Sequence, residues 1–222
     1  MNFLKYLPLL IAPLIFLILI FFARKIMEKK VLNLFASAYF LGLLTAIPMI
    51  LVLYFVYSYW LTHVQSLRRI VFYSFVLIGF LSELFKFLLL RFYYLPKKSF
   101  TKPFDGILFS VMIAMGYATA ANVYFFYEWR YTDGIRIVLY TLPVAVFFIS
   151  IIMGFFIGLS KFRSNNFDSL TGFSAAVILF GFYSFCLLSG DYLLLSLIGG
   201  GVILIAFLLA AKSLNSKTNA LL

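Results

Sequence analysis

Residues 70–95 read IVFYSFVLIGFLSELFKFLLLRFYYL, and two charged side chains, Glu83 and Lys86, lie near the middle of this long apolar stretch. Inserting one charged side chain at the centre of a bilayer costs about 2.5–3.5 kcal/mol, so charges there are rare and are either paired or functional. A spacing of three residues places Glu83 and Lys86 on one face of a helix, where they can form an ion pair. The stretch therefore predicts a membrane-spanning helix with a polar face buried in protein.

The composition of the whole chain is that of a membrane protein. Of its 222 residues, 65% are hydrophobic and only 11% are charged, and the mean hydropathy is +1.10. Soluble domains carry about 25% charged residues. The apolar runs are continuous rather than alternating, which favours helices over a β-barrel. We therefore predict an all-α, polytopic transmembrane helix bundle, with no room for a second, soluble domain.

Seven apolar stretches are long enough to cross a hydrocarbon core of about 30 Å. Of the 18 Lys and Arg residues, twelve fall on one side of these spans, five fall on the other, and Lys86 lies inside a span. The excess of positive charge predicts an outside N-terminus and a cytoplasmic C-terminus. We expect one transmembrane domain over residues 1–211 and a flexible polar tail over residues 212–222. The predicted spans are residues 7–23, 31–60, 70–95, 105–128, 136–160, 169–189 and 191–211.

The net charge of +11 does not indicate a nucleic-acid partner. The basic residues stand in short loops between spans, where they orient the protein and contact lipid headgroups. The expected partner of this charge is therefore the lipid bilayer.

The fourth span, residues 105–128, carries Asp105 at its start and Asn122 near its end. An amide inside a membrane needs a hydrogen-bond partner, and a bond to a neighbouring helix is a more common role than a contact to a ligand. Small residues around Gly116 allow close approach of another helix. The span is thus expected to lie inside the bundle, with ligand binding at Asn122 as the alternative.

The residues do not predict a metal site or another cofactor. The chain has one histidine, His63, in the loop between the second and third spans, and one cysteine, Cys186, in a distant span. Zinc needs three or four nitrogen, sulfur or carboxylate ligands around one point. The seven acidic residues are scattered, which also argues against a carboxylate site for Mg²⁺ or Ca²⁺.

Four motifs follow one another along the chain. They are SELFK at 82–86, an Asp-Gly pair at 105–106 followed by GYATAAN at 116–122, GFFIG at 154–158, and FGFYS at 180–184. Their order resembles that of the PrsW-type intramembrane metalloproteases, which are related to the CAAX proteases. The first two resemble the family's Glu-Glu-x-x-Lys motif and its helix reading Gly-Phe-Ala-x-x-Glu-Asn. The resemblance covers residues 75–190 and implies a PrsW-like core in a bacterial cytoplasmic membrane.

The resemblance also implies that most of the catalytic positions of that family are replaced. Ser82 stands for the first Glu of the pair, and Ala121 stands for the Glu before Asn. An apolar residue within 144–146, taken as Val146, stands for one His, and Phe180 stands for the last. Counting 1.5 Å per residue from the span ends places these positions and Glu83 roughly 10–20 Å deep, so we expect them in one layer. The retained polar residues, which are the candidate binding residues, are Glu83, Lys86, Asp105 and Asn122.

Three functions follow as hypotheses. The leading one is a catalytically inactive PrsW-like protein, which serves as a scaffold or complex subunit and binds another membrane protein. The alternative is a divergent protease or hydrolase that uses Glu83 as a general base. The third is a small-solute transporter, because a buried Glu–Lys pair can belong to an ion pathway.

Overall fold

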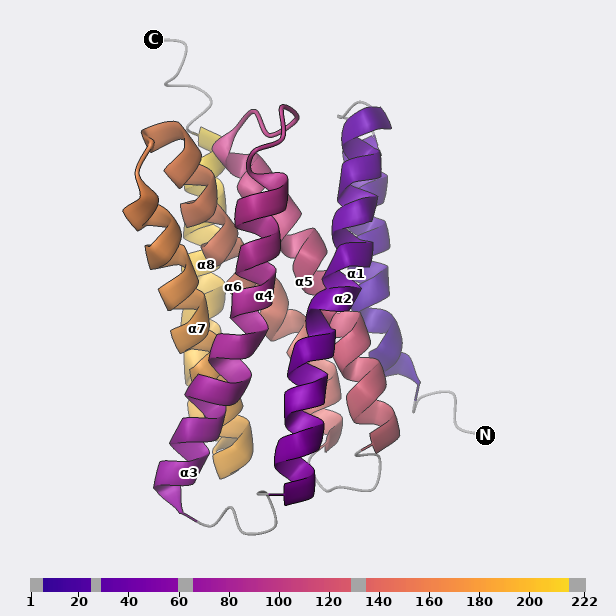
Figure 1. Cartoon of the computed structure of the whole chain (residues 1–222), viewed down its shortest axis with the longest axis vertical. Coiled ribbons are helices and arrows are strands. Elements are labelled where there is room, and N and C mark those ends of the chain that lie inside the picture. The colour runs from indigo at the N-terminus through magenta and orange to yellow at the C-terminus, as the bar shows by residue number, and fades with distance from the viewer. Residues whose placement is uncertain (1–5, 25–28, 60–65, 129–134, 216–222) are drawn as a thin grey trace.

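The chain folds into a bundle of antiparallel helices, seen in a computed structural model that describes residues 6–24, 29–59, 66–128 and 135–215 (Figure 1). Six helices in this part of the chain are long and apolar enough to cross a membrane. They are α1 (Leu7–Arg24), α2 (Lys29–Tyr59), α5 (Pro103–Glu128), α6 (Ile135–Arg163), α7 (Asn166–Ser189) and α8 (Tyr192–Asn215). The predicted polytopic helical bundle is confirmed.

A further crossing is built from four helical segments that follow one another without a break. They are α3 (Leu67–Phe72), η3 (Tyr73–Phe80), α4 (Leu81–Leu88) and η4 (Leu89–Tyr94). The two η segments are π-helical, a geometry that often occurs at functional sites. Glu83 and Lys86 lie on α4, the α-helical segment between them.

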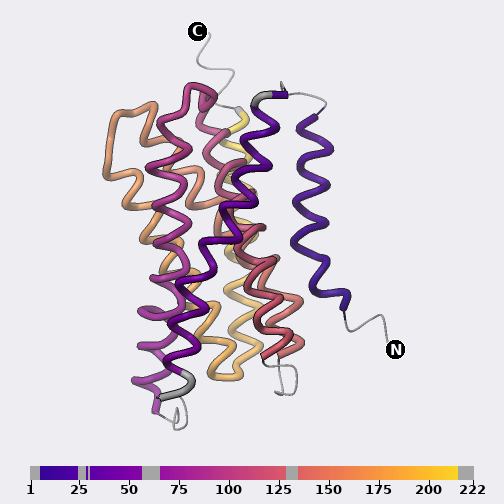
Figure 2. Tube along the Cα trace, turned by 45° about the vertical axis from the view of Figure 1, so that its right-hand side comes forward, coloured from indigo at the N-terminus to yellow at the C-terminus, as the bar shows by residue number. Residues whose placement is uncertain are grey.

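The positions of the first and last helices agree with an odd number of membrane crossings. Figure 2 shows α1 beginning near one end of the bundle and α8 finishing at the other. α8 continues to Asn215, so the first residues of the expected tail are helical, and residues 216–222 lie outside the described part. The side on which each end lies remains the prediction made from the loop charges.

Helices α5 and α6 form the centre of the bundle. About 78% of the membrane span of α5 and 67% of that of α6 is buried, against 11% for α1 and for α8. Glycines let the central helices touch. A Cβ on Gly106 of α5 would collide with the backbone of Gly154 and Gly158 on α6, and one on Gly116 would collide with the backbone of Tyr39 on α2. The GFFIG motif therefore serves close packing of α6 against α5.

The turn between α7 and α8 forms at Gly190 and Asp191. Gly190 adopts a left-handed conformation with φ of 74° and ends α7, a position where glycine avoids the steric cost of a side chain. The Asp191 carboxylate then accepts a hydrogen bond of 2.9 Å from the backbone N–H of Leu194. This bond caps the start of α8. Because the turn is so short, α7 and α8 form an antiparallel pair.

We expect Gly106→Val to destabilise the bundle, because the added side chain would force α5 away from α6. Overpacking of this kind costs about 1–3 kcal/mol. Thermal unfolding in a mild detergent measures the effect. Gly201→Val is the matched control, because nothing lies within 4 Å of a Cβ built there. Equal unfolding temperatures for the two variants would contradict this account of the α5–α6 contact.

The loop charges predict the topology, and reporter fusions test it. A fluorescent protein fused after Leu222 should fluoresce, because it would remain in the cytoplasm. Alkaline phosphatase fused after Trp129 should be active, because that loop would be outside. The opposite pattern at both positions would reverse the predicted orientation.

Candidate functional site

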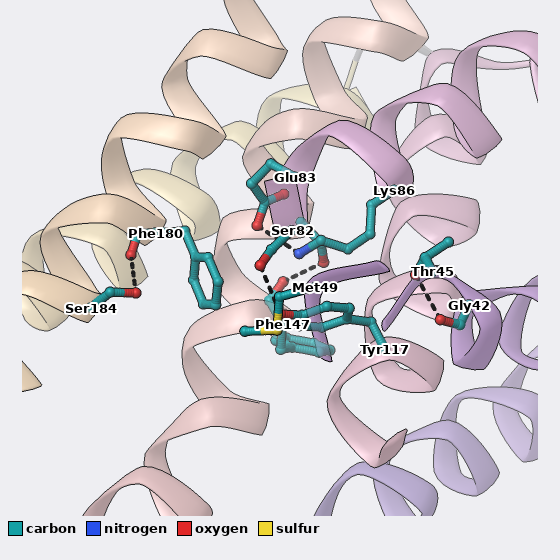
Figure 3. Close-up of polar contacts among 11 residues, drawn as sticks. Gly42, Thr45, Met49, Ser82, Glu83, Lys86, Tyr117, Phe147, Phe180 and Ser184 are labelled. Atoms are coloured by element: carbon teal, nitrogen blue, oxygen red, sulfur yellow. Dashed lines mark hydrogen bonds and ion pairs between the residues drawn. The ribbon is translucent and has the colours of Figure 1, made fainter. Parts of the chain in front are cut away.

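Glu83 and Lys86 form an ion pair in the centre of the bundle (Figure 3). Lys86 Nζ donates a hydrogen bond of 2.6 Å to Glu83 Oε1, and neither residue is exposed. The i,i+3 spacing on α4 brings the two groups together, as the sequence predicted. An unpaired charge at this depth would be costly, and each residue here neutralises the other.

The Lys86 ammonium also lies between two aromatic rings from other helices. Nζ is 4.6 Å from the ring centroid of Tyr117 on α5 and 5.2 Å from that of Phe180 on α7. The two rings meet edge to face, with their centroids 6.4 Å apart. A cation over an aromatic face is attracted by the electrons of the ring, and this attraction is stronger where water is excluded. The ammonium is thus held by one carboxylate and two rings.

The Tyr117 hydroxyl joins this cluster to α4 and α2. It donates a hydrogen bond to Ser82 Oγ at 2.8 Å, and it lies 3.3 Å from Met49 Sδ. All three residues are buried. We call this group, made of Met49, Ser82, Glu83, Lys86, Tyr117 and Phe180, the central cluster.

The four replaced positions are all buried, but only two of them have contacts that define the cluster. Ser82 binds the Tyr117 hydroxyl, and Phe180 packs near the Lys86 ammonium. Ala121 lies one helical turn after Tyr117 on α5, and Val146 lies on α6. Both are fully buried in the apolar core.

Asp105 and Asn122 lie outside the central cluster and make bonds that hold the fold. The Asp105 carboxylate accepts hydrogen bonds from the backbone N–H groups of Thr101 at 2.7 Å and Lys102 at 2.8 Å, which caps the start of α5. Asn122 Nδ2 donates to the carbonyl oxygens of Leu139 at 2.9 Å and Pro8 at 3.2 Å. This amide therefore ties α5 to α6 and α1, the interhelical role that the sequence favoured.

The sequence interpretation missed Tyr117 and Met49. Tyr117 lies inside the GYATAAN motif at a position to which the family resemblance assigns no role, and Met49 belongs to a span with no motif. A buried tyrosine needs a partner for its hydroxyl, which was the one available signal for Tyr117. Nothing in the sequence marked Met49, because its contact depends on how α2 packs.

An apolar cavity of about 140 Å³ adjoins the central cluster, and Met49 and Phe180 belong to both. It lies between α2, η3, α5, α6 and α7. Its walls offer almost no polar surface. The remaining lining residues are Leu53, Val56, Tyr73, Ile78, Phe125, Ile135, Val138, Leu142, Tyr183, Ser184, Leu187 and Leu188.

The central cluster does not fit a metal ion. Within the described residues, no group of three or more His, Cys, Asp or Glu side chains comes together. Glu83 is the one carboxylate of the cluster, and an ammonium holds its Oε1. Its Oε2 is buried and has no hydrogen-bond partner among the described residues. A single carboxylate beside a positive charge is a poor ligand set for a divalent cation.

Replacing Lys86 alone should destabilise the fold more than replacing both Glu83 and Lys86. Lys86→Met leaves a buried carboxylate without its partner, which costs about 3–5 kcal/mol. The double change Glu83→Met with Lys86→Met leaves no charge, and its stability should be close to that of the wild type. Thermal unfolding of the three proteins in one detergent measures the difference. If the single variant is as stable as the double variant, the ion pair is not what holds the cluster.

Comparison with known proteins gives the family of the chain. A family described as PrsW family intramembrane metalloprotease matches residues 30–211. Protease PrsW of Shouchella clausii is 31% identical over 198 residues, covering 87% of this chain and 89% of that protein. Protease PrsW of Clostridioides difficile is 36% identical over 106 residues, covering 46% and 44% of the two chains. Protease PrsW of Bacillus subtilis is 26% identical over 159 residues, covering 70% and 69%.

No solved structure matches the chain. The family match covers most of the sequence, and the S. clausii relative is similar over nearly the full length of both proteins. The six apolar helices of membrane length agree with an integral membrane protein. The chain therefore belongs to the PrsW family of intramembrane metalloproteases.

Proposed function

We propose that this chain is a catalytically inactive PrsW-family protein that binds a transmembrane segment of another membrane protein. One observation carries the proposal. Phe180, which stands where the family resemblance implies a histidine, packs its ring near the Lys86 ammonium and not toward a metal site. An aromatic ring in that place supports packing and cannot supply a ligand atom.

The other replaced positions support the same conclusion. The Ser82 hydroxyl accepts a hydrogen bond from Tyr117, and Ala121 and Val146 lie in the apolar core. A protein-bound zinc ion activates water only when enough ligands hold it, with one position left open. A single remaining carboxylate, already paired with Lys86, does not meet that requirement.

The apolar cavity beside the central cluster is the proposed contact point. Its 140 Å³ are bordered by five helical segments and lined almost entirely by carbon. A partner helix that places one large apolar side chain there would bury it away from both water and lipid. Such a contact depends on the fit between the side chain and the cavity and needs no catalytic group.

A protease that uses Glu83 is the second candidate. The observation that favours it is Glu83 Oε2, a buried carboxylate oxygen without a hydrogen-bond partner in the described part of the chain. A general base must reach the proton that it removes. The opposing observation is the 2.6 Å bond that Lys86 donates to Oε1, because it occupies one of the two oxygens that a general base would use.

Filling the cavity should release the partner. We expect Val138→Trp to reduce recovery of a co-purifying membrane protein at least fivefold in a mild-detergent pull-down from native membranes. Stoichiometry by mass spectrometry should be near one to one for the wild type. Val123→Trp is the matched control, because Val123 is exposed on α5 and does not line the cavity. Wild-type protein that is recovered alone would contradict the proposal.

Metal analysis separates the two candidates. We expect the purified protein to contain less than about 0.1 zinc per chain and Glu83→Gln to change nothing in its metal content or proteolytic activity. A finding of one tightly bound zinc per chain that is lost in Glu83→Ala would overturn the inactive assignment. Cleavage of a membrane substrate by the wild type but not by Glu83→Gln would establish the protease instead.

A further inference from the structure

A second apolar cavity opens on the outside of the bundle, where α8 lies against α6 and α7. Its volume is about 480 Å³, and Tyr183 is the one lining residue that it shares with the cavity beside the central cluster. We call it the α8 groove. Several residues that line it are exposed, including Val144 on α6 and Tyr192 and Ile203 on α8. Because these helices lie in a membrane, the opening of the groove faces lipid.

We propose that the α8 groove is a binding site for one acyl chain of a membrane lipid. The groove extends from Tyr192 to Ile203 along α8, and the eleven steps between these residues, at 1.5 Å each, give a length of about 16 Å. The hydrocarbon core is about 30 Å thick, so the groove covers about one leaflet. α6 and α8 begin at the same end of the bundle (Figure 1), so the groove starts at one membrane surface and ends near the middle.

The length of the groove favours a lipid chain over a partner helix. The groove covers about 16 Å along α8, which is about one leaflet. A membrane-spanning partner helix would contact α8 over the whole hydrocarbon core of about 30 Å. One extended acyl chain reaches through one leaflet and so matches the groove.

Three hydroxyl groups of the lining, those of Thr141, Tyr183 and Ser196, already have partners within the protein, which suits a hydrocarbon occupant. The hydroxyl groups of Thr141 and Tyr183 lie 2.9 Å apart and share a hydrogen bond. Ser196 Oγ donates to the carbonyl oxygen of Leu193 at 2.8 Å. Because these hydroxyl groups already have hydrogen-bond partners, covering them with an apolar chain costs little free energy.

Two glycines form part of the lining of the α8 groove. Gly199 and Gly200 line it, and a Cβ on either would meet no other atom within 4 Å. Without side chains at these positions, the space beside the α8 backbone is open to the chain. Gly201 is equally free of neighbours but does not line the groove, so it provides a control on the same helix.

Photolabelling tests the site. The protein would be reconstituted in phosphatidylcholine vesicles that contain a phosphatidylcholine with a diazirine on one acyl chain, irradiated, and mapped by mass spectrometry. We expect residues 140–149 and 192–203 to be labelled at least threefold more than the exposed face of α1 around Leu14 and Leu17. Labelling of the groove no stronger than that of α1 would overturn the proposal, because ordinary lipid contact would explain it.

Two variants test whether the labelling arises from a lipid chain inside the groove. Gly200→Leu should reduce labelling of residues 140–149 at least threefold, and Gly201→Leu should leave it at the wild-type level. Both should unfold near the wild-type temperature, since a Cβ at either position meets no other atom within 4 Å. Unchanged labelling in Gly200→Leu would overturn the proposal. A photoreactive residue at Val144 that crosslinks to a polypeptide in native membranes would assign the groove to a partner chain or a second copy instead.

Discussion

The ion pair between Glu83 and Lys86 is the constraint on which the rest of this structure depends. Neither charge is exposed, and the two groups are 2.6 Å apart on one helix face. In a low-dielectric interior each needs the other, and both must be kept away from lipid. The bundle meets this requirement by surrounding α4 with α2, α5 and α7, each of which contributes one side chain to the central cluster.

Close packing of the central helices makes that enclosure possible. Gly106 and Gly116 let α5 approach α6 and α2 until backbones touch, which places Tyr117 deep in the bundle. Tyr117 then faces the Lys86 ammonium with its ring and Ser82 with its hydroxyl. The same contacts that stabilise the charge therefore also fix the position of three helices, so that packing and electrostatics support each other.

The chain matches the sequence of its family over residues 30–211, from the start of α2 to the last turns of α8. Several of its buried residues, inside and outside the central cluster, favour packing. Phe180, Ala121 and Val146 contribute carbon to the core, and such side chains stabilise a bundle without any chemistry. Two apolar cavities add shaped apolar surface to this packing, one beside the central cluster and the other between α8, α6 and α7.

The sequence by itself determined the class of fold, the approximate limits of the helices and the Glu83–Lys86 pair. Long apolar runs must become helices in a membrane, because every backbone polar group needs an internal partner there. The pair is local, since three residues on one helix fix its geometry. Only the tertiary structure decided that Tyr117, Met49 and Phe180 surround the pair, and that Asp105 and Asn122 serve capping and helix contacts. Those relations join residues up to 114 positions apart. They depend on how helices rotate and pack, which periodicity in an almost wholly apolar chain does not specify.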